Sequence, residues 1–166
     1  MSMKNIAIVL FLGIILLGCG KSRDSSISLN GTLTNCPVNT LCTYNYFDHA
    51  GISATNQLVA GDDRVFWYKS VNSSLCNITN ELSFKTSVNS NSFIINSNVI
   101  AAGLVTYNQS CVCCNLIFVK PIGGEIKGKR TDVNQWLINA TVILGDNHNK
   151  PIDTLVVNQY FTLKAQ

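Results

Sequence analysis

Apolar and polar side chains alternate with a period of two along most of the chain. Apolar or β-branched residues occupy every second position from 82 to 88, and again from 136 to 144. Because successive side chains of a strand point to opposite faces, both runs predict half-buried β-strands. Similar patterns predict further strands at 27–34, 41–47, 57–60, 64–71, 92–96, 99–108, 112–120, 125–130 and 152–163. No window beyond residue 26 predicts an amphipathic helix.

Turn-forming residues separate these strands. Gly61-Asp62-Asp63, Asn89-Ser90-Asn91 and the segments 121–124 and 145–151 combine Gly, Pro, Asn, Asp and Ser. Strands at 134–144 and 152–163 are therefore expected to form a hairpin. Many short strands in one domain are typical of an antiparallel β-sandwich or a small β-barrel. We favour an all-β sandwich, with a barrel as the alternative.

The N-terminus carries a different pattern. Lys4 precedes an uncharged stretch from Ile6 to Leu17, and the small residue Gly18 follows. This order of charge, apolar run and small residue is typical of a secretory signal peptide. Twelve residues span about 18 Å as a helix, which is shorter than the ~30 Å hydrocarbon core of a bilayer. A permanent transmembrane helix is therefore not expected here.

Leu16-Leu17-Gly18-Cys19 resembles the lipobox of bacterial lipoproteins, although Leu17 stands where a small residue is more common. The resemblance covers about the first 20 residues. It implies that residues 1–18 are a cleaved signal peptide and that Cys19 carries a diacyl lipid, the only attached group expected. Residues 19–26 are then a lipidated tether, and 27–166 form a single β domain.

The resemblance also bears on location. Gly20 follows Cys19 where an aspartate would favour retention in the inner membrane, so an outer-membrane location in the bacterial envelope is preferred. Whether the domain faces the periplasm or the cell surface stays open. The expected membrane contact is the lipid itself.

Charge argues against polyanionic partners. Removing residues 1–18 takes away one of 12 basic residues and no acid, which leaves 11 against 9 and a net charge of +2. This small charge gives little attraction for nucleic acid. The segment Gly123–Lys129 matches most of a P-loop, but Arg130 replaces the Ser or Thr that would bind magnesium, and no helix is expected to follow. No nucleotide is therefore expected.

Basic residues nevertheless cluster around that turn: Lys120, Lys127, Lys129 and Arg130. Lysines on a solvated strand edge also block unwanted pairing, which is one interpretation of the cluster. The other is a contact with an anion or a lipid headgroup. Lys127, Lys129 and Arg130 are kept as candidate contact residues.

Six cysteines remain besides Cys19, an even number that favours disulfides in an exported protein: Cys36, Cys42, Cys76, Cys111, Cys113 and Cys114. Cys36 and Cys42 lie six positions apart and are expected to pair. The pairing of the other four is left open. If 112–119 is a strand, Cys114 faces the core.

Metal and redox chemistry are not expected at the Cys111–Cys114 segment. We read its Cys-x-Cys-Cys spacing as a poor match to the C-x₂₋₄-C pairs from which zinc sites usually start. Both methionines leave with the signal peptide, which disfavours a copper site. A thiol-redox role would require a C-x-x-C motif at the start of a helix. Disulfides are the simpler interpretation.

Catalytic motifs are also missing from the sequence. Neither His49 nor His148 lies in a G-x-S-x-G or H-E-x-x-H pattern, so no catalytic residue is assigned. His148 belongs to a polar turn, and Asp62-Asp63 fits a turn better than a catalytic pair. His49 follows Asp48 at the end of an aromatic run and is a candidate ligand contact.

Aromatic residues supply the remaining candidate site. Phe66, Trp67 and Tyr68 are consecutive on one predicted strand, so Trp67 must point away from the face that holds Phe66 and Tyr68. One face is then core. The other is covered by a loop, or it lines a groove for a glycan or a peptide.

These features predict a lipid-anchored, non-enzymatic envelope protein that acts in binding or assembly. Its partner would be another envelope protein or a glycan. One alternative is a carrier of lipid or another apolar ligand in a barrel cavity, which requires an unfilled interior. A second alternative is a hydrolase without a visible motif.

We predict that replacing Cys19 by Ser abolishes both lipid labelling and membrane retention. Stable anchoring needs two or more acyl chains, and this cysteine is the expected attachment point. Cells expressing either form are grown with a radiolabelled fatty acid, and their envelopes are fractionated. Equal labelling of the two forms would show that the lipoprotein assignment is wrong.

Overall fold

The computed structural model describes residues 27, 29 and 31–165. The predicted signal peptide, Cys19 and the tether 19–26 lie outside the described residues. Within the described part, no helix has the length and apolar character needed to cross a bilayer.

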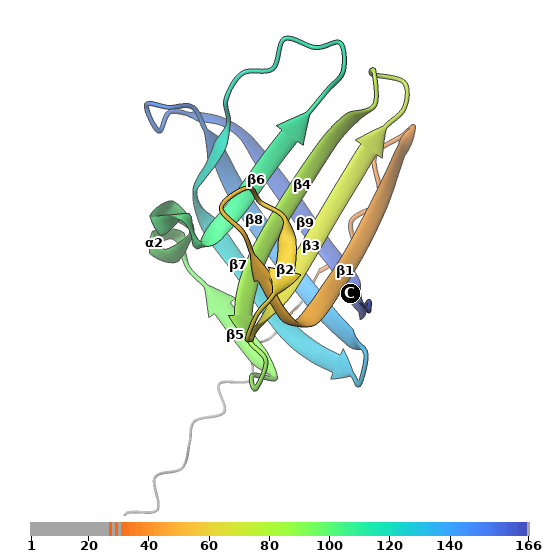
Figure 1. The fold of residues 1–166 in the computed structure, drawn as a ribbon, viewed down its shortest axis with the longest axis vertical. Helices are drawn as coiled ribbons and strands as arrows, with labels where there is room; N and C mark the ends of the chain where they lie inside the picture. Colours follow the sequence, from red (N-terminus) through yellow and green to blue (C-terminus); the bar gives the residue numbers. More distant parts are fainter. Residues whose placement is uncertain (1–26, 28, 30, 166) are drawn as a thin grey trace, which may run out of the picture.

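The described chain folds into one nine-stranded sheet that curls into a half-barrel (Figure 1). Its elements are β1 (Thr40–Ile52), β2 (Leu58–Ala60), β3 (Asp63–Asn72), β4 (Ile78–Ser87), β5 (Ser92–Ile95), α2 (Ser97–Val99) with a π-helical turn (Ile100–Leu104), β6 (Val105–Ser110), β7 (Lys120–Asp132), β8 (Gln135–Gly145) and β9 (Pro151–Leu163). The strand order is β5-β7-β8-β9-β1-β3-β4-β6, with β2 paired to β1. The all-β prediction is confirmed, but two stacked sheets are not observed.

Strand pairing is antiparallel except between β1 and β9, which pair at Asn45 with Thr162 and at Tyr46 with Leu163. Residues 32–34 accompany β9: the Thr34 N–H donates to the Asn158 carbonyl at 2.8 Å, and the Asn158 side-chain amide donates to the Thr32 carbonyl at 2.9 Å. The prediction of a strand at 27–34 is wrong for the described residues, because only isolated bonds form. The predicted C-terminal hairpin is confirmed as β8 and β9.

Two other predicted strands differ in the structure. The first half of 99–108 is helical, because the Asn96 side chain accepts from the Val99 N–H at 3.2 Å and begins a helical turn. Gly103, with φ 84°, lies near the end of this helical segment, and β6 begins at Val105. Residues 112–119 form a loop rather than a strand.

Disulfides hold that loop. The Cys36–Cys42 bridge forms as expected. The four cysteines whose pairing the sequence left open form the bridges Cys76–Cys113 and Cys111–Cys114. Cys114 is exposed, so its predicted core position is wrong. The Sγ atoms of Cys111, Cys113 and Cys114 lie within 4.8 Å of one another, but all three are bonded in disulfides. The spacing argument against a zinc or thiol-redox site was wrong, because Cys111 and Cys114 are themselves spaced C-x-x-C. No helix begins there, and these two cysteines are bonded to each other.

Aromatic rings fill the concave interior of the half-barrel. Phe66 is fully buried at the centre, and its ring centroid lies 5.2–5.8 Å from those of Phe84, Trp136 and Phe161. The alternating positions 136–144 of β8 are all buried, as predicted. Such ring contacts add to the free energy gained by burying apolar area. The interior is therefore packed as a core.

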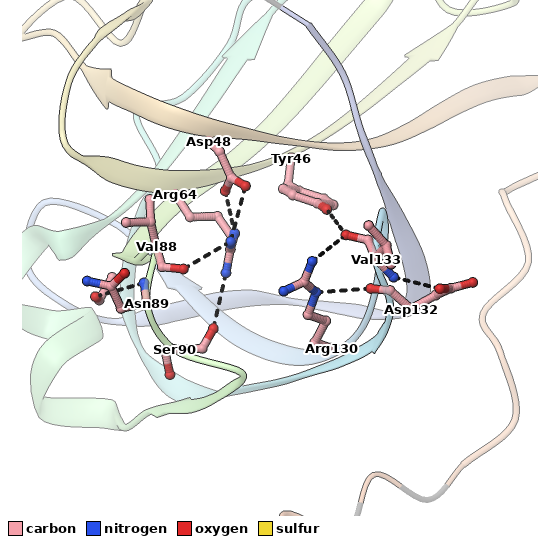
Figure 2. Close-up of polar contacts among 10 residues, drawn as sticks. Tyr46, Asp48, Arg64, Val88, Asn89, Ser90, Arg130, Asp132 and Val133 are labelled. Carbon is pink, nitrogen blue, oxygen red and sulfur yellow. Dashed lines mark hydrogen bonds and ion pairs between the residues drawn. The ribbon is translucent and has the colours of Figure 1, made fainter.

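One cation is buried in this interior, at the end near the β4–β5 turn (Figure 2). The Arg64 side chain is 4% exposed, and its Nε and Nη2 donate to the two carboxylate oxygens of Asp48 at 2.6 and 3.2 Å. Nη1 and Nη2 also donate to the carbonyls of Ser90 and Val88 at 3.2 and 3.1 Å. The guanidinium carbon lies 4.7 Å from the Trp136 ring centroid. These contacts join β1, β3, the β4–β5 turn and β8.

We predict that Arg64→Ala lowers the free energy of unfolding by about 2–3 kcal/mol. The change leaves the partly exposed Asp48 carboxylate and the carbonyls of Val88 and Ser90 without their buried donor. Arg130→Ala is the matched control. The Arg130 side chain donates to the carbonyls of Asp132 and Val133 but is exposed, so removing it should lower the free energy of unfolding by under about 1 kcal/mol. Urea midpoints compare the variants. Equal losses would contradict the role assigned to Arg64.

Candidate binding groove

The aromatic run of β3 divides between the two faces of the sheet, as predicted. Phe66 and Tyr68 are 0% and 5% exposed and belong to the interior, whereas Trp67 lies half-buried on the outer face. Val65 shares the outer face but is fully buried. The outer face is therefore covered at Val65 and open at Trp67.

Trp67 lines a groove of about 540 Å³ on this outer face. Pairing of β1 with β3 places Asn45 directly opposite Trp67 and Thr43 opposite Lys69. Because residues two apart on a strand share a face, Thr43, Asn45 and Phe47 form one side of the groove floor. The register of two neighbouring strands thus sets one aromatic ring beside one amide.

A tight turn between β1 and β2 forms the wall of the groove. The Ser53 hydroxyl accepts from the Gln57 N–H at 3.1 Å, and the Ser53 N–H donates to the Gln57 carbonyl at 2.9 Å. Asn56 adopts the left-handed region with φ 56°, which asparagine tolerates well. The turn therefore holds Asn56, Gln57 and Leu58 against the groove.

The polar groups of the groove differ in how they are satisfied. Lys69 and Glu81 form an ion pair at 3.0 Å. In contrast, the side-chain amides of Asn45, Asn56 and Gln57 make no hydrogen bond to another residue in the described part of the chain. The same holds for the indole N–H of Trp67 within residues 31–165. The groove thus combines one ion pair and a further cation, Lys164, with uncharged groups that are free to bind a ligand.

The other candidate contact residues lie elsewhere. His49 is exposed at a bulge of β1, with φ 55°, and does not line the groove. Lys127 pairs with Glu125 at 2.5 Å, and Lys129 is exposed, both on β7. Arg130 donates to carbonyls of the β7–β8 turn (Figure 2). The structure does not bring these four residues together with Trp67.

The P-loop-like segment lies entirely inside β7. Gly128, the second glycine of the motif, pairs with Phe93 of β5, and a Cβ there would clash with the Phe93 ring. This glycine is therefore explained by close approach of two strands, without a phosphate. Its presence in the sequence reflects sheet geometry.

A second hollow, of about 490 Å³, lies near β6 and the start of β7 and is lined in part by Tyr107 and Phe118. Burial, followed by the charge of Asp153 and the effect of Tyr68, raises the pKa of Tyr107 to about 12. Its hydroxyl donates to the Asn80 amide oxygen at 2.9 Å. Tyr107 therefore stays neutral at physiological pH and serves as a hydrogen-bond donor.

Most of the groove residues could not be found from the sequence. The alternation of side chains along β3 identified Trp67 as an outer-face residue. Asn45, Asn56 and Lys164 line the same groove but come from other parts of the chain. Only strand pairing and the fold of the β1–β2 turn bring them together.

No protein-family model, curated protein or solved structure matches the chain.

We predict that Trp67 accounts for nearly all fluorescence quenching by acrylamide. Trp136, the other tryptophan, is 0% exposed, so the quencher cannot reach it without local opening. Trp67→Phe should reduce the Stern–Volmer slope to near zero, whereas the wild type should show a clearly positive slope. Unchanged quenching in the variant would show that Trp67 is covered.

Proposed function

We propose that this protein is a lipid-anchored, non-enzymatic binding module of the bacterial envelope, and that its contact site is the Trp67 groove. The observation that carries the proposal is the placement of Trp67 on the outer face, beside three amides with no partner among the described residues. An open aromatic ring with convergent polar groups is typical of a binding site.

The packed interior supports binding on the surface rather than inside. A carrier needs a cavity behind its strands, but the concave face here is filled by Phe66, Trp136, Phe161 and their neighbours. The packed interior of the half-barrel therefore supports the groove from behind and helps to hold β1 and β3 in a fixed register.

The chemistry of the groove supports a binding role over hydrolysis. Its carboxylate, Glu81, is engaged by Lys69 at 3.0 Å. His49, which could serve a hydrolase as a base, is exposed on the bulged part of β1 and outside the groove lining. A hydrolase would need a base within hydrogen-bond reach of a nucleophile or a water in the site.

The anchor rests on the sequence. The lipobox-like segment ending at Cys19 precedes the described domain, and the short tether 19–26 would keep the domain close to its membrane. Gly20 supports the outer membrane as that location. The proposed module is thus held at a bilayer by lipid and holds its partner through the groove.

We predict that Trp67→Ala reduces capture of envelope material without unfolding the protein. The full-length lipidated protein is purified from detergent-solubilised envelopes, and retained proteins and glycans are quantified. Aromatic anchors commonly carry much of a contact, so retention should fall ~10-fold or more. The melting temperature should change little, since Trp67 lies outside the core.

Phe118→Ala is the control for this experiment. Phe118 is 62% exposed and lines the second hollow rather than the groove. Its variant should retain wild-type capture. Loss of capture in Phe118→Ala but not in Trp67→Ala would move the contact site to the second hollow and contradict the proposal.

A further inference from the structure

We infer that the ligand of the Trp67 groove is a neutral glycan, bound as a short stretch of a few sugars. This inference rests on the proposed function and names the chemistry of its partner. Four properties of the groove support it: the ring, the uncharged amides, the charge balance and the position on the face of the sheet.

The ring of Trp67 offers a flat apolar platform. It is half-buried and lines an open groove. A pyranose presents C–H groups on its faces and hydroxyls around its rim. A pyranose ring can therefore stack on the indole of Trp67, and the indole N–H can at the same time donate a hydrogen bond to a hydroxyl.

Three side-chain amides line the same groove as this ring. Asn45 lies opposite Trp67 on β1, and Asn56 and Gln57 project from the wall. A side-chain amide offers two donors and one acceptor, and a hydroxyl is both donor and acceptor, so the two groups match in either orientation. Because these amides have no partner among the described residues, binding breaks no internal hydrogen bond.

The charge of the groove favours an uncharged ligand. Lys69 is neutralised by Glu81, and Lys164 is the remaining cation among the described lining residues. Recognition of an acidic polymer usually uses several cations or a bidentate arginine. A single unpaired lysine does not meet that requirement.

The position of the groove disfavours an extended peptide. Peptides that add a strand need an open sheet edge with free backbone groups. The groove instead lies on the face of the sheet, where β3 is paired on both sides, with Asn45 of β1 and Ser83 of β4 flanking Trp67. Its volume of about 540 Å³ suits a small ligand held by side chains.

The test uses the full-length lipidated protein in detergent micelles. Fluorescence and calorimetry follow binding of neutral hexasaccharides from β-1,4-glucan, β-1,4-mannan, α-1,4-glucan and chitin, with an oligogalacturonate as the acidic comparison. We expect at least one neutral sugar to bind more tightly than the acidic one. Trp67→Ala should weaken that binding ~10-fold or more, and Asn45→Ala should weaken it less, by about 3-fold or more. Phe118→Ala should leave it unchanged.

Several results would overturn the inference. These are no binding by any neutral sugar, tighter binding of the acidic one, or binding that Trp67→Ala does not weaken. If Trp67-dependent capture from envelopes then yields a protein, the proposed function stands and the glycan class is wrong. If neither sugars nor captured material depend on Trp67, both proposals fail.

Discussion

The buried charge of Arg64 is the constraint on which the half-barrel depends. Removing a guanidinium from water costs several kcal/mol unless its donors are satisfied. Here Asp48 and two carbonyls of the β4–β5 turn satisfy it, and the Trp136 ring lies against its face. Asp48 and the β4–β5 turn lie on or directly after strands that pair with β3 (Figure 2). Trp136 belongs to β8, which two strands separate from β3 in the sheet, so its ring reaches Arg64 only because the sheet is curled. A flat sheet would leave the guanidinium without this ring.

The same two strands connect this interior pair to the groove. β1 carries Asp48 inside and Asn45 outside, while β3 carries Arg64 inside and Trp67 outside. Because the side chains of a strand alternate strictly, fixing the inner register also fixes which groups meet on the outer face. The ring of Trp67 and the amide of Asn45 are thus aligned by forces that act on the other side of the sheet.

Local patterns allowed prediction of most strands, the β8–β9 hairpin, the Cys36–Cys42 bridge and the division of Phe66 from Trp67 between faces. Each depends on residues close together in the sequence. The curl of the sheet and the groove depend on pairing between distant segments, which alternation does not encode. The helical turn before β6 was missed because Ile100 and its apolar neighbours fit either state, and a single cap at Asn96 decided between them.

Rigidity of the groove would favour binding of the proposed neutral ligand. Side chains on paired strands lose less conformational entropy on binding than side chains on long loops. A larger share of the free energy of each contact is therefore left as binding free energy. The wall is a short turn held by Ser53, and Cys36–Cys42 fastens the start of β1. A half-exposed tryptophan in a free protein keeps apolar area in contact with water. In the proposed complex a sugar face would cover that area and recover this free energy, while its hydroxyls would meet the free amides.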